Sequence, residues 1–131
     1  MSAAGPRLPL GEEKRRAARR RYQRQGHWAE HMAALALRLR GYRILGRRVE
    51  TPRGEIDLIA VRGRRLAFVE VKRRPTLEAA EAALTGTKRA RIRRAAALWL
   101  ARNAPYQSHE IGFDLMLMVG RRWPRYLRNA L

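Results

Sequence analysis

Cysteine is absent from this chain of 131 residues. Its absence excludes disulfide frameworks, thiolate zinc sites and cysteine nucleophiles, and it is compatible with a reducing compartment. Long apolar runs are also missing: none approaches the ~18 residues that a membrane span needs. With no export signal evident, we expect a cytoplasmic protein that does not contact a membrane.

Acidic residues are few compared with basic ones. The chain has 11 Asp and Glu against 30 Lys and Arg, which gives a formal net charge of +19. Such an excess attracts polyanions strongly and makes nucleic acid the expected partner. A binding protein without catalytic activity would show the same charge, so the charge names a class of partner and not a reaction.

The first 25 residues differ in composition from the rest of the chain. Gly5, Pro6 and Pro9 precede a dense basic run, and little apolar surface is available for burial. We expect a basic arm over residues 1–25 that is mobile, or helical once phosphates neutralise its charge, and that binds phosphate through Arg19, Arg20 and Arg21. Residues 26–131 are predicted to form a single domain.

The apolar pattern of residues 26–131 alternates between helical and strand periods. The expected elements, in chain order, are a helix over 28–39, strands over 42–49, 56–61 and 66–72, a helix over 82–102 and a strand over 111–119. The order is therefore α-β-β-β-α-β. This pattern predicts an α/β domain in which helices flank one sheet.

Two of the predicted strands carry acidic residues within apolar surroundings. Because side chains alternate along a strand, Asp57 should share a face with Ile59 and Val61, and Glu70 should lie beside Lys72. A hairpin through residues 62–64 would then bring Asp57 close to Glu70. Two carboxylates at that distance require a cation.

A hard divalent ion, Mg²⁺ or Mn²⁺, matches these oxygen donors. The expected ligands are Asp57, Glu70 and the carbonyl of Val71, and Lys72 is placed to orient or deprotonate a water that attacks a phosphodiester. The plain alternative is that these acids are surface charges on edge strands. The apolar neighbours favour central strands, where an unpaired acid is costly, and so favour the metal site.

Other side chains have both structural and functional interpretations. Lys88 could bind phosphate at the site or extend from the edge of the core, and we assign it to phosphate together with Arg73 and Arg91. Glu55 is expected to pair with an arginine rather than to bind metal, and the same is expected of Asp114.

The three tryptophans also have either a structural or a functional interpretation. Trp28 and Trp99 lie on predicted helix faces and are expected in the core, whereas Trp123, with Tyr126 nearby, is a candidate for base stacking.

Two short motifs carry a resemblance to a known family. The segments Gly-Glu-Ile-Asp-Leu-Ile at 54–59 and Phe-Val-Glu-Val-Lys at 68–72 resemble the YraN-like family of uncharacterised bacterial proteins, as do Ala29-Glu30, Lys88 and Phe113-Asp114. The likeness covers roughly residues 26–131. That family is similar to the restriction-endonuclease-like fold, closest to archaeal Holliday junction resolvases, whose motif is an Asp followed on the next strand by Glu-x-Lys.

The resemblance implies a restriction-endonuclease-like core with a mixed four- to five-stranded sheet flanked by helices. It also implies that Glu30, on the first helix, is a further catalytic acid. Ile56 departs from the Pro that often precedes the motif Asp. Resolvases of this type act as symmetric dimers, so a homodimer is an expectation that comes from the resemblance alone.

The expected function is a Mg²⁺-dependent endonuclease that acts on branched or structured DNA, with DNA favoured over RNA. The alternative is a non-catalytic DNA- or RNA-binding module on the same fold, which keeps its acids for structural reasons.

The basic arm leads to a prediction about binding. Replacing Arg19, Arg20 and Arg21 together by Ala should weaken nucleic-acid binding and reduce the slope of log K against log[salt] by up to about 3, because each phosphate contact contributes about 0.9. Fluorescence anisotropy over a salt series measures both quantities. Unchanged binding would remove the arm from the mechanism.

Overall fold

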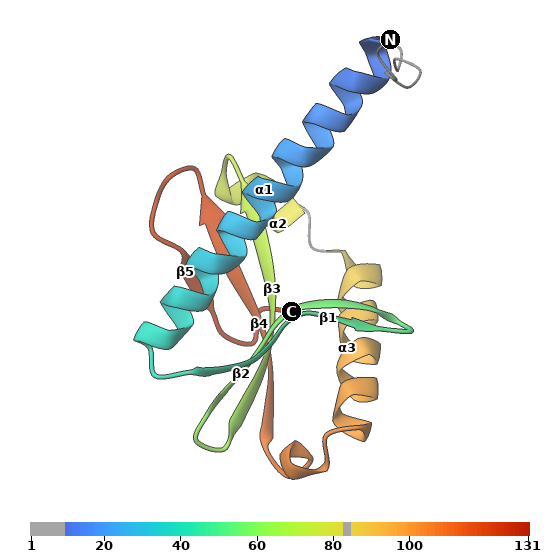
Figure 1. Cartoon of the computed structure of the whole chain (residues 1–131). Helices are drawn as coiled ribbons and strands as arrows, with labels where there is room; N and C mark the ends of the chain where they lie inside the picture. The colour runs from blue at the N-terminus through green and yellow to red at the C-terminus, as the bar shows by residue number, and fades with distance from the viewer. Residues whose placement is uncertain (1–9, 83–84) are drawn as a thin grey trace, which may run out of the picture.

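Helices lie on both sides of one five-stranded sheet (Figure 1). The computed structural model describes the backbone of residues 10–82 and 85–131, and the side chains of 15, 27–79, 82 and 85–131. The elements are α1 (Leu10–Leu39), β1 (Arg43–Thr51), β2 (Gly54–Arg62), β3 (Arg65–Arg74), α2 (Leu77–Ala82), α3 (Gly86–Ala101), η1 (Ala104–Tyr106), β4 (Glu110–Val119) and β5 (Arg125–Leu127). None of the described helices combines the length and apolar character that would let it cross a bilayer.

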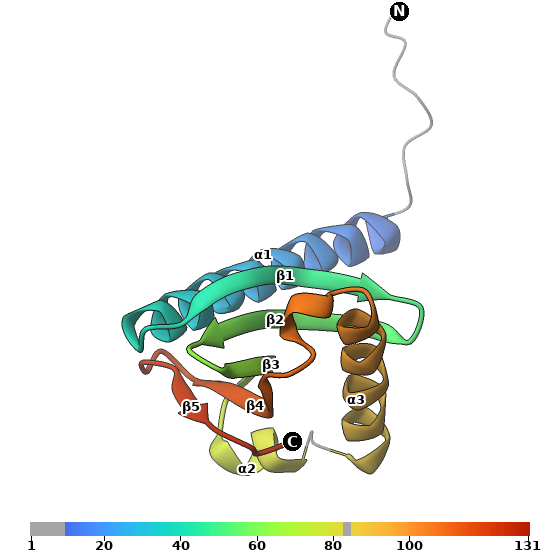
Figure 2. The same cartoon turned by 90° about the horizontal axis from the view of Figure 1, so that it is seen from below.

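The strands follow one another across the sheet in chain order, β1-β2-β3-β4-β5. Neighbouring strands are antiparallel except β3 and β4, which are parallel, so the sheet is mixed as expected. The turn between β2 and β3 is tight because Gly63 adopts a φ of +58°, a conformation that costs glycine little. The parallel pair needs a crossover connection, which α2 and α3 provide (Figure 2).

Helix α1 begins much earlier than the predicted 28–39. Its second half packs on the sheet through Ala29, Ala33 and Leu37, while its first half runs out beyond the sheet (Figure 1). The backbone is therefore helical over the part of the basic arm from Leu10 onward. Residues 1–9, and the side chains of Arg19, Arg20 and Arg21, lie outside the described part of the chain.

The predicted helix over 82–102 is wrong at its N-terminal end. Ala82 is the last residue of the short helix α2, and α3 begins only at Gly86, after Thr85. Thr85 has extended backbone angles and its side chain accepts a hydrogen bond from the Lys88 N–H at 3.2 Å, which satisfies a free donor of the first turn. An N-cap so placed fixes where α3 starts and puts Lys88 in its first turn.

The C-terminal tail contains a strand that the sequence did not predict. Strand β5 pairs with β4 and completes the sheet, which gives the upper value of the expected four to five strands. The observed order therefore includes α2, η1 and β5 in addition to the predicted elements. Three-residue strands carry too short an alternating pattern to be recognised.

The core is divided between the two faces of the sheet. On the α1 side, Leu58, Ala60, Ala67 and Val69 pack with residues of α1. On the α3 side, Ile59, Val61, Leu66 and Phe68 pack with Ala95 and Ala96 of α3. Strands β2 and β3 are consequently buried on both faces, which explains their continuous apolar sequences.

A buried ion pair connects β3 to β4 at one end of the sheet. The guanidinium of Arg65 donates to both oxygens of Asp114, at 2.6 and 2.8 Å, and the residues are 6% and 0% exposed. Tyr126 also donates to Asp114, and the Asn129 N–H donates to it at 2.8 Å. The predicted pairing of Asp114 with an arginine is confirmed.

This ion pair requires a glycine beside it. A Cβ at Gly112 would collide with the guanidinium of Arg65, which cannot move away because Asp114 holds it. We expect Gly112→Ala to lower the free energy of unfolding by about 1–3 kcal/mol, measured by urea denaturation. Gly86→Ala is the matched control and should have little effect, since in the described part of the chain no atom beyond its own helix backbone and its chain neighbours lies within 4 Å of its Cβ position. Equal losses in both variants would contradict this account.

Candidate functional site

Asp57 lies where β2 and β3 stop pairing. The last paired residues between these strands are Leu58 and Val69, so Asp57 and Glu70 follow immediately. Beyond this point Oδ2 of Asp57 accepts a hydrogen bond from the Val71 N–H at 2.8 Å. The side chain of Asp57 thus takes the place that a strand carbonyl would occupy, and its carboxylate is fixed against β3.

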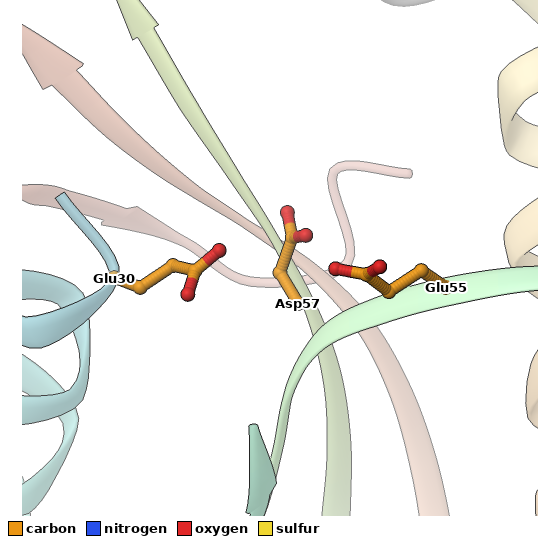
Figure 3. A group of neighbouring side chains, drawn as sticks. All are labelled: Glu30, Glu55 and Asp57. Atoms are coloured by element: carbon orange, nitrogen blue, oxygen red, sulfur yellow. The ribbon is translucent and has the colours of Figure 1, made fainter. Parts of the chain in front are cut away.

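The predicted faces of β2 are wrong around Asp57. Ile56 packs in the α3-side core with Ile59 and Val61, whereas Leu58 packs in the α1-side core. Regular alternation therefore breaks between Ile56 and Leu58. At this break the carboxylate of Asp57 hydrogen-bonds to β3 and lies near Glu30 of α1 (Figure 3).

Glu70 and Lys72 are neighbours on β3, as the alternation predicted. Their Oε1 and Nζ atoms are 3.0 Å apart, and both side chains are nearly buried, at 11% and 12% exposed. Glu70 is also close enough to Asp57 to raise the pKa of Asp57. The structure thus brings Asp57, Glu70 and Lys72 together. The predicted role of the Val71 carbonyl stays a prediction.

Glu30 reaches the same place from α1. Carboxylate oxygens of Glu30, Glu55 and Asp57 all lie within 4.8 Å of one another (Figure 3). Glu30 also pairs with Arg48 through a 2.7 Å contact between Oε2 and Nε. Arg48 has a φ of +48°, which is uncommon outside glycine, so β1 bends at the residue that holds Glu30.

Glu55 was missed as a member of the acidic cluster. The sequence favoured an arginine partner, but among the described side chains Glu55 forms no ion pair, and its carboxylate points toward Asp57. The available signal was its position two residues before Asp57 in the same strand. Glu55 and Glu70 therefore approach Asp57 as two further candidate ligands.

The half-buried carboxyl group of Asp57 has an unfavourable environment for its negative charge. Burial, and then the charge of Glu70, raise the pKa of Asp57 from its ordinary value to about 7, against the opposing hydrogen bond from Val71. Nearby Glu30 adds to the rise. A divalent cation bound beside Asp57 would favour its anionic form and lower its pKa.

Basic side chains gather beside Glu70. The amino groups of Lys72 and Lys88 lie near each other, and the positive charge of Lys72 lowers the pKa of Lys88. The charge of Arg74 lowers it further. Converging amines of this kind suit a phosphate group. Lys88 is therefore brought to the site from α3.

Arg91 and Arg73 lie at two different places around the site. Arg91 packs against Gly54, and its Cγ and Cδ atoms each lie 3.1 Å from where a Cβ at Gly54 would be, closer than an ordinary contact. Arg73 is exposed, and its guanidinium lies 5.6 Å from the ring centre of Trp28.

Trp28, expected in the core, is instead 45% exposed, while Trp99 packs in the core as predicted. Trp123 is 52% exposed, but Tyr126 belongs to the Asp114 network.

The raised pKa of Asp57 predicts how stability depends on pH without metal. The folded chain retains the Asp57 proton up to about pH 7, whereas the unfolded chain loses it near 3.8. Between these values the folded state binds more protons, so the free energy of unfolding should fall as pH rises, by on the order of 3 kcal/mol. Urea denaturation in a chelator over this range measures the fall.

Asp57→Asn should remove this part of the pH dependence, because the amide does not titrate. The matched control is Glu110→Gln at an exposed position at the start of β4, which should retain it. Equal slopes in wild type and Asp57→Asn would show that Asp57 does not cause the fall.

Comparison with known proteins places these residues in a family. The model described as "Uncharacterised protein family UPF0102" matches residues 29–118, a span that includes Glu30, Asp57, Glu70, Lys72 and Lys88. A UPF0102 protein of Chelativorans sp. (strain BNC1) is 50% identical over 120 residues, covering 92% of this chain and 96% of that protein. Another, of Methylorubrum populi, is 52% identical over 114 residues, covering 87% and 91%. The chain therefore belongs to the UPF0102 family.

Proposed function

We propose that this protein is a Mg²⁺- or Mn²⁺-dependent endonuclease that hydrolyses phosphodiester bonds in branched or structured DNA. The observation that carries the proposal is the half-buried carboxyl group of Asp57, whose pKa is raised by burial and by Glu70 and which lies within 4.8 Å of carboxylate oxygens of Glu30 and Glu55. The resemblance of this Asp and the following Glu-x-Lys to the motif of restriction-endonuclease-like resolvases supports it.

The donor set fits a hard divalent ion. Asp57 and Glu70 offer carboxylate oxygens on adjacent strands, and Glu30 and Glu55 each bring one within 4.8 Å of Asp57. Such ligands suit Mg²⁺ and Mn²⁺ and leave positions for water and phosphate. When bound, the ion would neutralise charge on the phosphate and lower the pKa of water.

The protein's own groups would perform the remaining steps. Lys72, whose ammonium is 3.0 Å from Glu70, would donate a hydrogen bond that orients the attacking water. Lys88 would hold a non-bridging phosphate oxygen and offset the charge that develops there. The large positive net charge would bind the DNA backbone on both sides of the cleaved bond.

Cleavage of labelled DNA tests the proposal. Four-way junction, flap, duplex and single-stranded DNA are incubated with the protein in Mg²⁺ or Mn²⁺. We expect cleavage of the branched substrates, and a rate at least about a hundredfold lower for Asp57→Asn and Lys72→Ala, because each removes a group acting on the transition state. Glu110→Gln is the matched acidic control and should cleave normally.

Substitutions at Glu70 and Glu55 distinguish between two possible sets of metal ligands. If Asp57 and Glu70 hold the ion, Glu70→Gln should abolish cleavage and Glu55→Gln should leave most of it. The reverse result would assign the ligand role to Glu55. Binding of all four substrates with no cleavage in either metal would contradict the nuclease proposal and favour a non-catalytic binding module.

A further inference from the structure

One large aromatic side chain beside the acidic cluster is left uncovered. Trp28 lies on α1, and its neighbour Ala29 is buried against the sheet, yet the indole itself is 45% exposed. Tryptophan is usually well buried because exposure of its large apolar surface to water is unfavourable. An exposed indole next to a candidate active site therefore has ring surface that a ligand can contact.

The surroundings of Trp28 are cationic. The guanidinium of Arg73 lies 5.6 Å from the indole ring centre, within the range of a cation–π interaction. Among the described residues no aromatic ring pairs with Trp28. The indole can therefore offer ring surface to a flat ligand while Arg73 attracts a negative charge beside it.

Trp28 and Arg73 are also next to the proposed catalytic groups in the chain. Glu30 follows Trp28 by two residues on α1, and Arg73 directly follows Lys72 on β3. Because residues two apart on a helix and consecutive residues on a strand point in different directions, the indole would hold a nucleotide adjacent to the one at the catalytic groups. A net charge of +19 and an arginine over the ring favour a polyanion over an apolar protein partner.

A nucleobase satisfies these conditions. Its flat face stacks on an indole, and the phosphates of the same strand bind arginine and lysine. Inside a continuous duplex both faces of a base are covered by neighbouring base pairs, so only an unstacked base can use the platform.

We propose that Trp28 and Arg73 form a stacking platform for an unpaired base of the substrate strand, which selects DNA with unpaired nucleotides beside the cleaved bond. This inference rests on the proposed function, since it assigns a substrate feature to the same site. It makes Trp28 a positioning residue, because the indole contacts the base and not the reacting phosphate.

The test measures binding with cleavage disabled. The Asp57→Asn chain is titrated with flap DNA that carries 2-aminopurine at the unpaired nucleotide next to the branch, and with a fully paired duplex of equal length. We expect the flap to bind more tightly and its 2-aminopurine emission to be quenched on binding. Adding Trp28→Leu should weaken flap binding about tenfold and abolish the quenching, with little change for the duplex.

Three further variants serve as comparisons. Trp28→Phe should retain part of the flap preference because it keeps a ring, and Arg73→Ala should weaken flap binding while leaving the indole in place. Leu35→Ala removes an apolar side chain of similar exposure, 43%, on the same helix and should change neither quantity. Circular dichroism checks that each variant is folded.

Equal loss of flap and duplex affinity in Trp28→Leu, or unaltered quenching, would overturn the platform. These outcomes are separate from failure of the nuclease proposal, which is judged by Mg²⁺-dependent cleavage in the chain with Asp57 intact. A chain that never cleaves but shows the Trp28-dependent flap preference would retain the platform and lose the catalytic role.

Discussion

Strand β3 is paired along both edges and covered on both faces, and the other elements are arranged around it. β2 lies on one edge and β4 on the other, while α1 and α3 cover the two faces. A strand in this position can carry charged residues only where they find partners, because an isolated buried charge is very costly. Its two ends meet this requirement in different ways.

At its first end, the charge on β3 is balanced by the protein itself. Arg65 is paired with Asp114 and two tyrosine hydroxyls, and Asn129 adds a further contact. Burial by itself raises the pKa of Asp114, but the hydrogen bonds from Arg65, Asn129 and Tyr126 outweigh it, and the pKa lies below its usual range. This end is a closed structural network that fixes β4 and β5.

At its second end, the charges are only partly balanced. Asp57 accepts a hydrogen bond from Val71, which lowers its pKa. Burial and the charge of neighbouring Glu70 outweigh this bond and raise the pKa. The same residue type is therefore stabilised as an anion at one end of the sheet and destabilised as an anion at the other. A protein that needed Asp57 only for stability would be expected to pair it as it pairs Asp114, and this contrast supports a functional role for the second end.

The sequence by itself determined the two main helices, the first four strands and which side chains meet at the site. Alternation predicted that Glu70 and Lys72 are neighbours, and the short turn predicted that Asp57 and Glu70 meet, since both depend on local backbone geometry. Only the tertiary structure decided which face Asp57 uses, that Glu55 joins the cluster and that Trp28 stays exposed. These features depend on where β2 separates from β3 and on how α1 crosses the sheet, and such long-range packing leaves no periodic signal in the sequence.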